Sequence, residues 1–107
     1  MPIPHPNRAE VWIADLGMVA KTRPVVVLGV PSMPNDRVLF TVIPRTTSLH
    51  GTRFEIAIPK PFFKGIGAFD AQGVVNGPLP RFHRKLGFLL PDEMALIEDA
   101  VRLWLGL

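Results

Sequence analysis

The sequence contains no cysteine, which excludes disulfides, thiolate nucleophiles and every cysteine-based zinc site. It also lacks the unbroken run of about 18 apolar residues that a membrane-spanning helix needs. The start of the chain, MPIPHPNRAE, has neither a basic segment followed by an apolar run nor an amphipathic arginine-rich pattern, so no targeting signal is expected. These absences predict a cytoplasmic protein without a membrane anchor.

Local signatures of common enzymes are missing as well. The chain has no phosphate-binding P-loop, no GxSxG elbow, no HExxH helix and no calcium loop. Its three histidines have no spacing typical of metal ligands, so neither a metal nor another cofactor is expected. His50 and His83 could still meet in space as an acid–base pair of a ribonuclease, because catalytic pairs need not be close in sequence.

The length of 107 residues fits one domain and leaves no room for a separate cofactor-binding unit. We therefore expect a single domain over residues 1–107, with residues 1–9 forming a flexible proline-rich arm. Hydrophobic residues make up 48% of the chain and charged residues 20%, which is enough apolar material for a packed core. The net charge of +3 favours anionic partners only modestly.

Twelve prolines and nine glycines separate short β-branched runs, a pattern typical of a small β protein. Strands are predicted over residues 10–15, 24–30, 37–43 and 53–58, with another around 68–75, and Pro44 is expected to end the third strand. Apolar residues at helical spacing from Leu90 to Trp104 predict one C-terminal helix that begins at Pro91 and ends at Gly106. The expected fold is mainly β, an SH3-like antiparallel barrel of roughly five to seven strands closed by this helix.

Polar side chains lie where the predicted apolar strands end. Arg23 directly precedes the valine strand, and Thr46 and Thr47 follow Pro44 and Arg45. A rigid strand can hold such side chains in a fixed position, although threonines at a strand end also satisfy nearby backbone groups in turns. If the two strand ends meet, they form a patch suited to phosphate contacts, with the members Arg23, Arg45, Thr46, Thr47, His50 and Arg53.

A second cationic group spans residues 81–85, RFHRK. An aromatic side chain among cationic ones is common on RNA-binding surfaces, and a solvated turn before the last strand or helix explains the pattern equally well. In the C-terminal helix, Trp104 and its apolar neighbours are predicted to be core or dimer contacts.

Four segments in their order resemble one family. EVWIADLG, TRPVVVLG, TVIPRTTS and LGFLLPDEMALIEDAVRLWLGL, spread over residues 8–107, resemble the MazF/PemK toxins of bacterial toxin–antitoxin modules. The resemblance implies an SH3-like barrel, usually a homodimer, that inhibits growth by cutting single-stranded RNA such as mRNA at short sequences without a metal, until an acidic antitoxin silences it. It implies catalytic roles for Arg23 and Thr46. Around them we expect RNA contacts from Lys21, Arg45, Thr47, His50, Arg53, Gln72, Arg81 and Lys85.

The same resemblance implies that the RNA 2′-hydroxyl attacks the adjacent phosphate and leaves a cyclic phosphate and a free 5′-hydroxyl. A fixed guanidinium at Arg23 would stabilise charge on the phosphate oxygens, and the Thr46 hydroxyl would donate a further hydrogen bond. Arginine stays charged in proteins, so Arg23 is expected to act mainly electrostatically.

Two features depart from the family pattern. Only residues 16–22 separate Asp15 from Arg23, where the family usually has a longer loop rich in Gly, Ser, Glu and Gln. Where many members have Asp-Gln, this chain has Asp70-Ala71-Gln72, which predicts that Asp70 is displaced by one residue and faces the other way.

These departures leave a different class of function open, a barrel that binds without cutting RNA. The related CcdB toxins poison DNA gyrase through the end of the C-terminal helix, where Trp104, Leu105 and Leu107 stand in this chain. An RNA- or partner-binding domain without toxicity is the third alternative.

Overall fold

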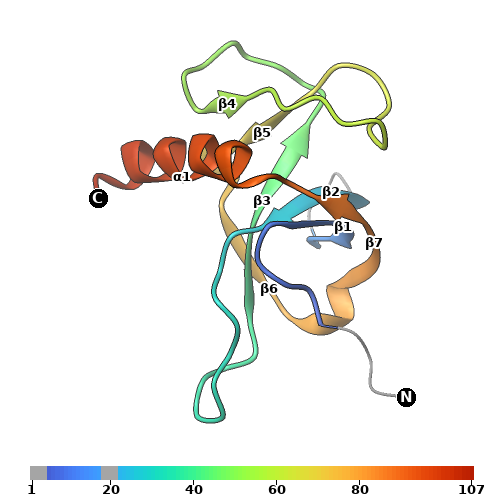
Figure 1. Cartoon of the computed structure of the whole chain (residues 1–107), viewed down its shortest axis with the longest axis vertical. Helices are drawn as coiled ribbons and strands as arrows, with labels where there is room; N and C mark the ends of the chain where they lie inside the picture. The colour runs from blue at the N-terminus through green and yellow to red at the C-terminus, as the bar shows by residue number, and fades with distance from the viewer. Residues whose placement is uncertain (1–4, 18–21) are drawn as a thin grey trace.

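The computed structural model describes residues 5–17 and 22–107. Within these residues the chain forms a strongly bent, seven-stranded antiparallel sheet and one C-terminal α-helix (Figure 1). The predicted mainly β fold is confirmed. The elements in chain order are β1 (Glu10–Asp15), β2 (Thr22–Val27), β3 (Phe40–Thr46), β4 (Glu55–Ile56), β5 (Ala68–Asp70), the 3-10 helix η1 (Ala71–Gly73), β6 (Val75–Gly77), the 3-10 helix η2 (Leu79–Arg81), β7 (Phe82–Phe88) and α1 (Pro91–Leu105).

The order of the strands determines which strand ends lie side by side. The sheet runs β4-β5-β3-β2-β1-β7, and β6 pairs with β3 beside this path. Because antiparallel neighbours run in opposite directions, the ends of β1 and β3 lie beside the starts of β2, β5 and β7. We call this end of the sheet the rim, and its members are Asp15, Arg23, Thr46, Ala68 and Arg81.

Two apolar clusters cover the two faces of the central strands. Val26 belongs to the cluster under α1, together with Ile43, Phe69 and Ile97, whereas Val25 belongs to the opposite cluster around Trp12. Adjacent residues of a strand point to opposite faces, so a strand that is buried on both sides needs an unbroken apolar run. The valine run of the sequence is therefore the central strand β2, as predicted.

The prediction that Pro44 ends the third strand is wrong. β3 extends to Thr46, and Pro44 is paired with Val25 in the terminal pair of the ladder with β2. The next residue, Arg45, pairs with Phe69 of β5 instead. Proline can donate no ladder hydrogen bond, and here it lies at the point where β3 changes its partner strand.

The second half of the sheet also differs from the predicted strands. The expected strand over residues 68–75 is divided into β5 and β6 by η1, where the Asp70 carboxylate accepts a hydrogen bond of 3.0 Å from the Gln72 N–H. The expected strand over residues 53–58 shrinks to β4. Residues 82–85 of the cationic group belong to β7 and pair with β1, so the alternative of a solvated turn is wrong for them.

Residues 5–9, predicted as part of a flexible arm, are bound to the body of the protein. The Arg8 guanidinium donates to the carbonyl of Leu28 and pairs with Glu98 on α1. Ala9 links β2 to the end of β7, because its N–H donates to Val27 and its carbonyl accepts from Leu89, each at 2.8 Å. Residues 1–4 lie outside the described part of the chain.

The helix begins and ends as its sequence predicts. Pro91 opens α1, the Glu93 carboxylate accepts the Leu90 N–H at 2.8 Å, and Gly106 ends the helix with a left-handed φ of 72°. Such a φ favours glycine. The predicted core contact at Trp104 is partial, because its side chain is 44% exposed and meets Phe54 edge to face, with ring centroids 5.4 Å apart. Among the described residues no helix is long and apolar enough to span a membrane.

Acid is expected to destabilise this fold through Glu93. Its hydrogen bond from Leu90 and then its contact with Lys60 lower its pKa below the ordinary 4.5. As the pH falls, Glu93 is therefore protonated in the unfolded chain before it is protonated in the folded chain. Its contribution to stability is complete above the pKa of the unfolded chain and is lost as the pH falls through the lowered pKa of the folded chain. We expect a lower Tm at about pH 3 than at neutral pH, and a smaller difference for Glu93→Gln. Calorimetry that finds the same difference in both proteins would refute this role.

Candidate active site

The strand register brings the two predicted catalytic residues to one place. The β2–β3 ladder pairs Val27 with Val42 and Val25 with Pro44. Arg23 and Thr46 lie two residues beyond the Val25–Pro44 pair, near the start of β2 and at the end of β3. Arg23 is paired with Ala14 of β1. Arg23 is therefore held by β1 at the rim, on the end of the sheet where Thr46 also lies.

Asp70 shares a face with Thr46. Thr46 is paired with Ala68, and residues two apart on a strand point the same way, so Ala68 and Asp70 lie on the Thr46 face. Glu55 of β4 is paired with Asp70 and joins this face. The expectation that Asp70 faces the other way is wrong, because the partner register of β5 decides its direction.

The loop between β3 and β4, residues 47–54, extends the site. The Thr46 hydroxyl oxygen accepts the Ser48 N–H at 3.0 Å, which fixes the first turn of the loop. Further along, Glu55 accepts hydrogen bonds from the backbone N–H groups of His50, Gly51 and Thr52. The side chains of Thr47 and His50, both predicted RNA contacts, are exposed on this loop.

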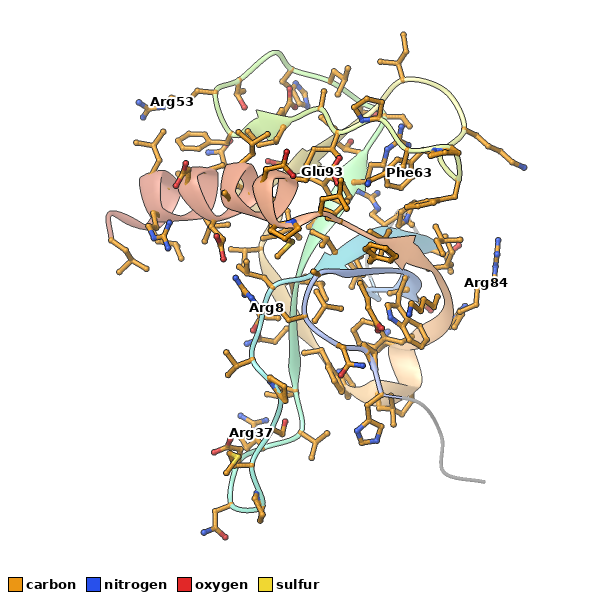
Figure 2. The ribbon with its side chains drawn as sticks, viewed as in Figure 1. Arg8, Arg37, Arg53, Phe63, Arg84 and Glu93 are labelled. Atoms are coloured by element: carbon orange, nitrogen blue, oxygen red, sulfur yellow. The ribbon has the colours of Figure 1, made fainter. Side chains whose placement is uncertain are left out.

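Arg45 points away from Thr46 and is buried. Its side chain is only 8% exposed, its Nη2 donates to the Gly65 carbonyl at 3.0 Å, and its guanidinium carbon lies 4.3 Å from the centre of the Phe63 ring. Burial lowers the pKa of Arg45. Figure 2 shows Phe63 on the connection that packs over this end of β3. The Arg45 guanidinium, which was predicted to contact RNA, therefore binds Gly65 and Phe63 inside the fold. Adjacent residues of a strand point to opposite faces, so Arg45 points away from the face that carries Thr46.

Arg81 is the predicted RNA contact that joins the rim. Its Nη1 lies 3.9 Å from an Asp15 carboxylate oxygen, and its guanidinium covers Gly17 so closely that a Cβ there would come within 2.7 Å of it. Asp15 also accepts the Gly17 N–H at 2.8 Å. Asp15 and Gly17 are therefore contacted from η2 at the rim.

The other predicted RNA contacts lie elsewhere. Lys85 pairs with Glu10 at 2.8 Å. Arg53 stacks on Phe54 with its guanidinium carbon 4.8 Å from the ring centre, and Figure 2 places it beside α1, on the other side of the molecule from Arg84. Gln72 is exposed in η1. Lys21 lies outside the described residues.

Sequence reasoning missed Asp15 and Glu55 as parts of the site. Asp15 carried a weak signal, since an aspartate two residues before a glycine at a strand end is a common turn former. In the sequence, Glu55 is one charged residue of an alternating strand pattern. That pattern does not indicate its hydrogen bonds to residues 50–52.

A surface hollow of about 720 Å³ lies over the paired strands β1 and β7 and over η2. Trp12 and Phe82 meet edge to face there, with ring centroids 6.3 Å apart. Cationic and titratable side chains stand around this apolar floor, namely His83, Arg84 and Lys85.

The two histidines considered as a catalytic pair are not brought together. His50 lies on the loop before β4 and His83 on β7, the strands at opposite ends of the sheet order, and no hydrogen bond between them is found among the described residues. Among the described residues, no three carboxylate or imidazole side chains gather into a group that could hold a metal ion.

Solved structures with this fold include toxins and their complexes. Mycobacterium tuberculosis toxin MazF-mt6 matches with a TM-score of 0.78 at 22% identity, covering 92% of this chain and 97% of that one. The MazE–MazF structure (Form-II) from Deinococcus radiodurans matches with a TM-score of 0.79 at 19% identity, covering 98% and 99%. An endoribonuclease in complex with its cognate antitoxin, from a mycobacterial species, matches with a TM-score of 0.78 at 19% identity, covering 96% and 97%.

At these identities the structures show a shared fold, and the sequence itself shows the family. A family model described as PemK-like, MazF-like toxin of type II toxin–antitoxin system matches residues 7–105. This range contains all the strands, α1 and every residue of the rim. The chain therefore belongs to the family of PemK-like, MazF-like toxins of type II toxin–antitoxin systems.

Proposed function

We propose that this toxin is a sequence-selective endoribonuclease that cuts single-stranded RNA without a metal ion. The observation that carries the proposal is the antiparallel β2–β3 ladder, which brings Arg23 and Thr46 to the same rim, each two residues beyond the Val25–Pro44 pair. Proteins of the same fold described as endoribonucleases, one alone and one with its cognate antitoxin, support it.

In the proposed reaction the RNA supplies its own nucleophile. The 2′-oxygen forms a bond to the adjacent phosphorus as the bond to the 5′-oxygen breaks, and the proton lost by the 2′-hydroxyl balances the one gained by the leaving 5′-oxygen. Negative charge grows on the phosphate oxygens meanwhile. A guanidinium on a residue held by strand pairing stabilises that charge without having to reorganise, and this is the role of Arg23. The Thr46 hydroxyl donates a hydrogen bond to the same phosphate.

RNA contacts beyond the scissile phosphate are assigned to side chains at the rim or on the segments that follow its strands. We keep this role for Arg81, Thr47, His50 and Gln72, and for Lys21 from the family resemblance alone. The remaining three predicted contacts are given structural roles instead, because their charged groups are already engaged by Phe63, Phe54 and Glu10. These are Arg45, Arg53 and Lys85.

The partners proposed from the sequence are an acidic antitoxin and a second copy of the chain. The hollow over β1, β7 and η2 has an apolar floor, and Arg84 lies at its border beside the Lys85–Glu10 ion pair, which suits an acidic peptide segment with an apolar anchor. Exposed leucines on the outer face of α1, Leu96 and Leu103 among them, support a homodimer. Analytical ultracentrifugation tests the dimer, and a fluorescent acidic peptide titrated against wild type and Trp12→Ala tests the hollow.

Replacing Thr46 by valine should slow RNA cleavage by about 10- to 100-fold, because valine keeps the shape of threonine and removes the hydroxyl donor. Thr46→Ser should keep most of the activity, because the hydroxyl remains. Initial rates on an unstructured RNA in EDTA measure the difference.

The serine variant also separates catalysis from folding, since both hydroxyl residues can accept the Ser48 N–H. If the valine and serine variants cut at the same rate, the Thr46 hydroxyl takes no part in the reaction.

A further inference from the structure

A single carboxylate organises the middle of loop 47–54. The Glu55 oxygens accept the His50 N–H at 3.0 and 3.1 Å, the Gly51 N–H at 2.7 Å and the Thr52 N–H at 3.3 Å. Three successive backbone donors thus converge on one charged group. Residues 47–53 are exposed, whereas Phe54 anchors the far end of the loop in the core. Exposed residues have few packing contacts to order them, so the bonds to Glu55 set the shape of residues 50–52.

The position of Glu55 in the sheet is electrostatically unfavourable unless the loop satisfies its charge. It stands directly across from Asp70, and like charges in directly opposed cross-strand positions destabilise a sheet. The hydrogen bonds from the loop, that of His50 first, lower the pKa of Glu55, so its charge is satisfied by the loop. The sheet holds an anion at β4 whose hydrogen bonds all go to the loop that follows Thr46.

Loop shape and the catalytic threonine are joined directly. The Thr46 oxygen accepts the Ser48 N–H, so the loop begins at the residue that contacts the phosphate, and Glu55 holds its other end. We propose that Glu55 is a positioning residue for RNA binding, which keeps Thr47 and His50 in the arrangement that contacts RNA beside Thr46. This inference rests on the proposed endoribonuclease function.

The test compares Glu55→Ala and Glu55→Gln with a matched carboxylate. Asp36 lies in the long β2–β3 connection and accepts the Met33 N–H at 2.8 Å, so Asp36→Ala removes a similar turn contact far from the rim. For Glu55→Ala we expect KM for a short single-stranded RNA to rise about tenfold while kcat stays within about twofold, because a disordered loop weakens binding more than the chemical step. Glu55→Gln, which keeps one accepting oxygen, should lie between, and Asp36→Ala should match wild type.

Hydrogen exchange supplies a reading that does not depend on cleavage. The amides of residues 50–52 should exchange at least about tenfold faster in Glu55→Ala than in wild type, with the amides of β2 unchanged.

Three results would overturn the inference. A fall in kcat at constant KM means that the substitution only reduces the amount of folded protein. Wild-type kinetics in Glu55→Ala beside an active wild-type enzyme overturn the positioning role alone. A wild-type protein that cuts no RNA overturns the proposed function itself, and the positioning role with it.

Discussion

Arg23→Ala should lower the rate of RNA cleavage by about 10²- to 10³-fold, the usual loss when a fixed donor to a developing oxyanion is removed. Arg23 is half-buried and its strand is paired with β1 on one side and β3 on the other. Arg23→Lys should recover only part of the rate, because an ammonium keeps the charge and loses the planar fork that binds two phosphate oxygens.

The matched control is Arg37→Ala. Arg37 is exposed on the β2–β3 connection, which projects from the body of the protein at the opposite end of β3 from Thr46 (Figures 1 and 2). The Arg37→Ala substitution removes the same charge as Arg23→Ala and should leave the cleavage rate unchanged. Equal rates for the two alanine variants would mean that Arg23 acts only through net charge.

Ile97→Ala should cost about 2–5 kcal/mol of the free energy of unfolding, the range found when a large buried aliphatic side chain is cut back to a methyl group. Ile97 is 1% exposed and packs with Ile43, Phe69 and Val26 in the cluster under α1. The loss has two parts, the transfer free energy of the removed carbons and the cavity left in a rigid sheet. In a domain of ordinary stability this is a large fraction of the total.

Urea unfolding measures the change, with Ile66→Ala as the control. Ile66 is the same residue type at 83% exposure, on the connection between β4 and β5, and its truncation should change the unfolding free energy by no more than about 0.5 kcal/mol. If the two variants were equally stable, α1 would not be packed on the sheet as described.

Much of the fold follows from local patterns. The unbroken apolar run of β2 signals a strand buried on both faces, and the helical spacing from Met94 to Val101 signals α1. The positions of Arg23 and Thr46 at strand ends are local facts too, and the family resemblance singled them out for catalysis.

What could not be predicted depends on pairing between distant segments. β3 runs through Pro44 because β5 becomes its partner there, and nothing near Pro44 in the sequence announces β5. The same register turns Asp70 to the Thr46 face and Arg45 into the apolar interior against Phe63. Strand alternation says that Arg45 and Thr46 point apart, but only the packed structure says which of them is buried.

The most direct test incubates the purified protein with a long, unstructured RNA in EDTA, beside Arg23→Ala, and maps the cut ends. Endoribonuclease action at the rim predicts discrete cuts at a short recurring sequence, with a cyclic phosphate on one side and a free 5′-hydroxyl on the other, and almost none in the variant. Intact RNA after incubation with folded wild-type protein, or equal cutting by Arg23→Ala, would contradict it and favour a barrel that acts by binding.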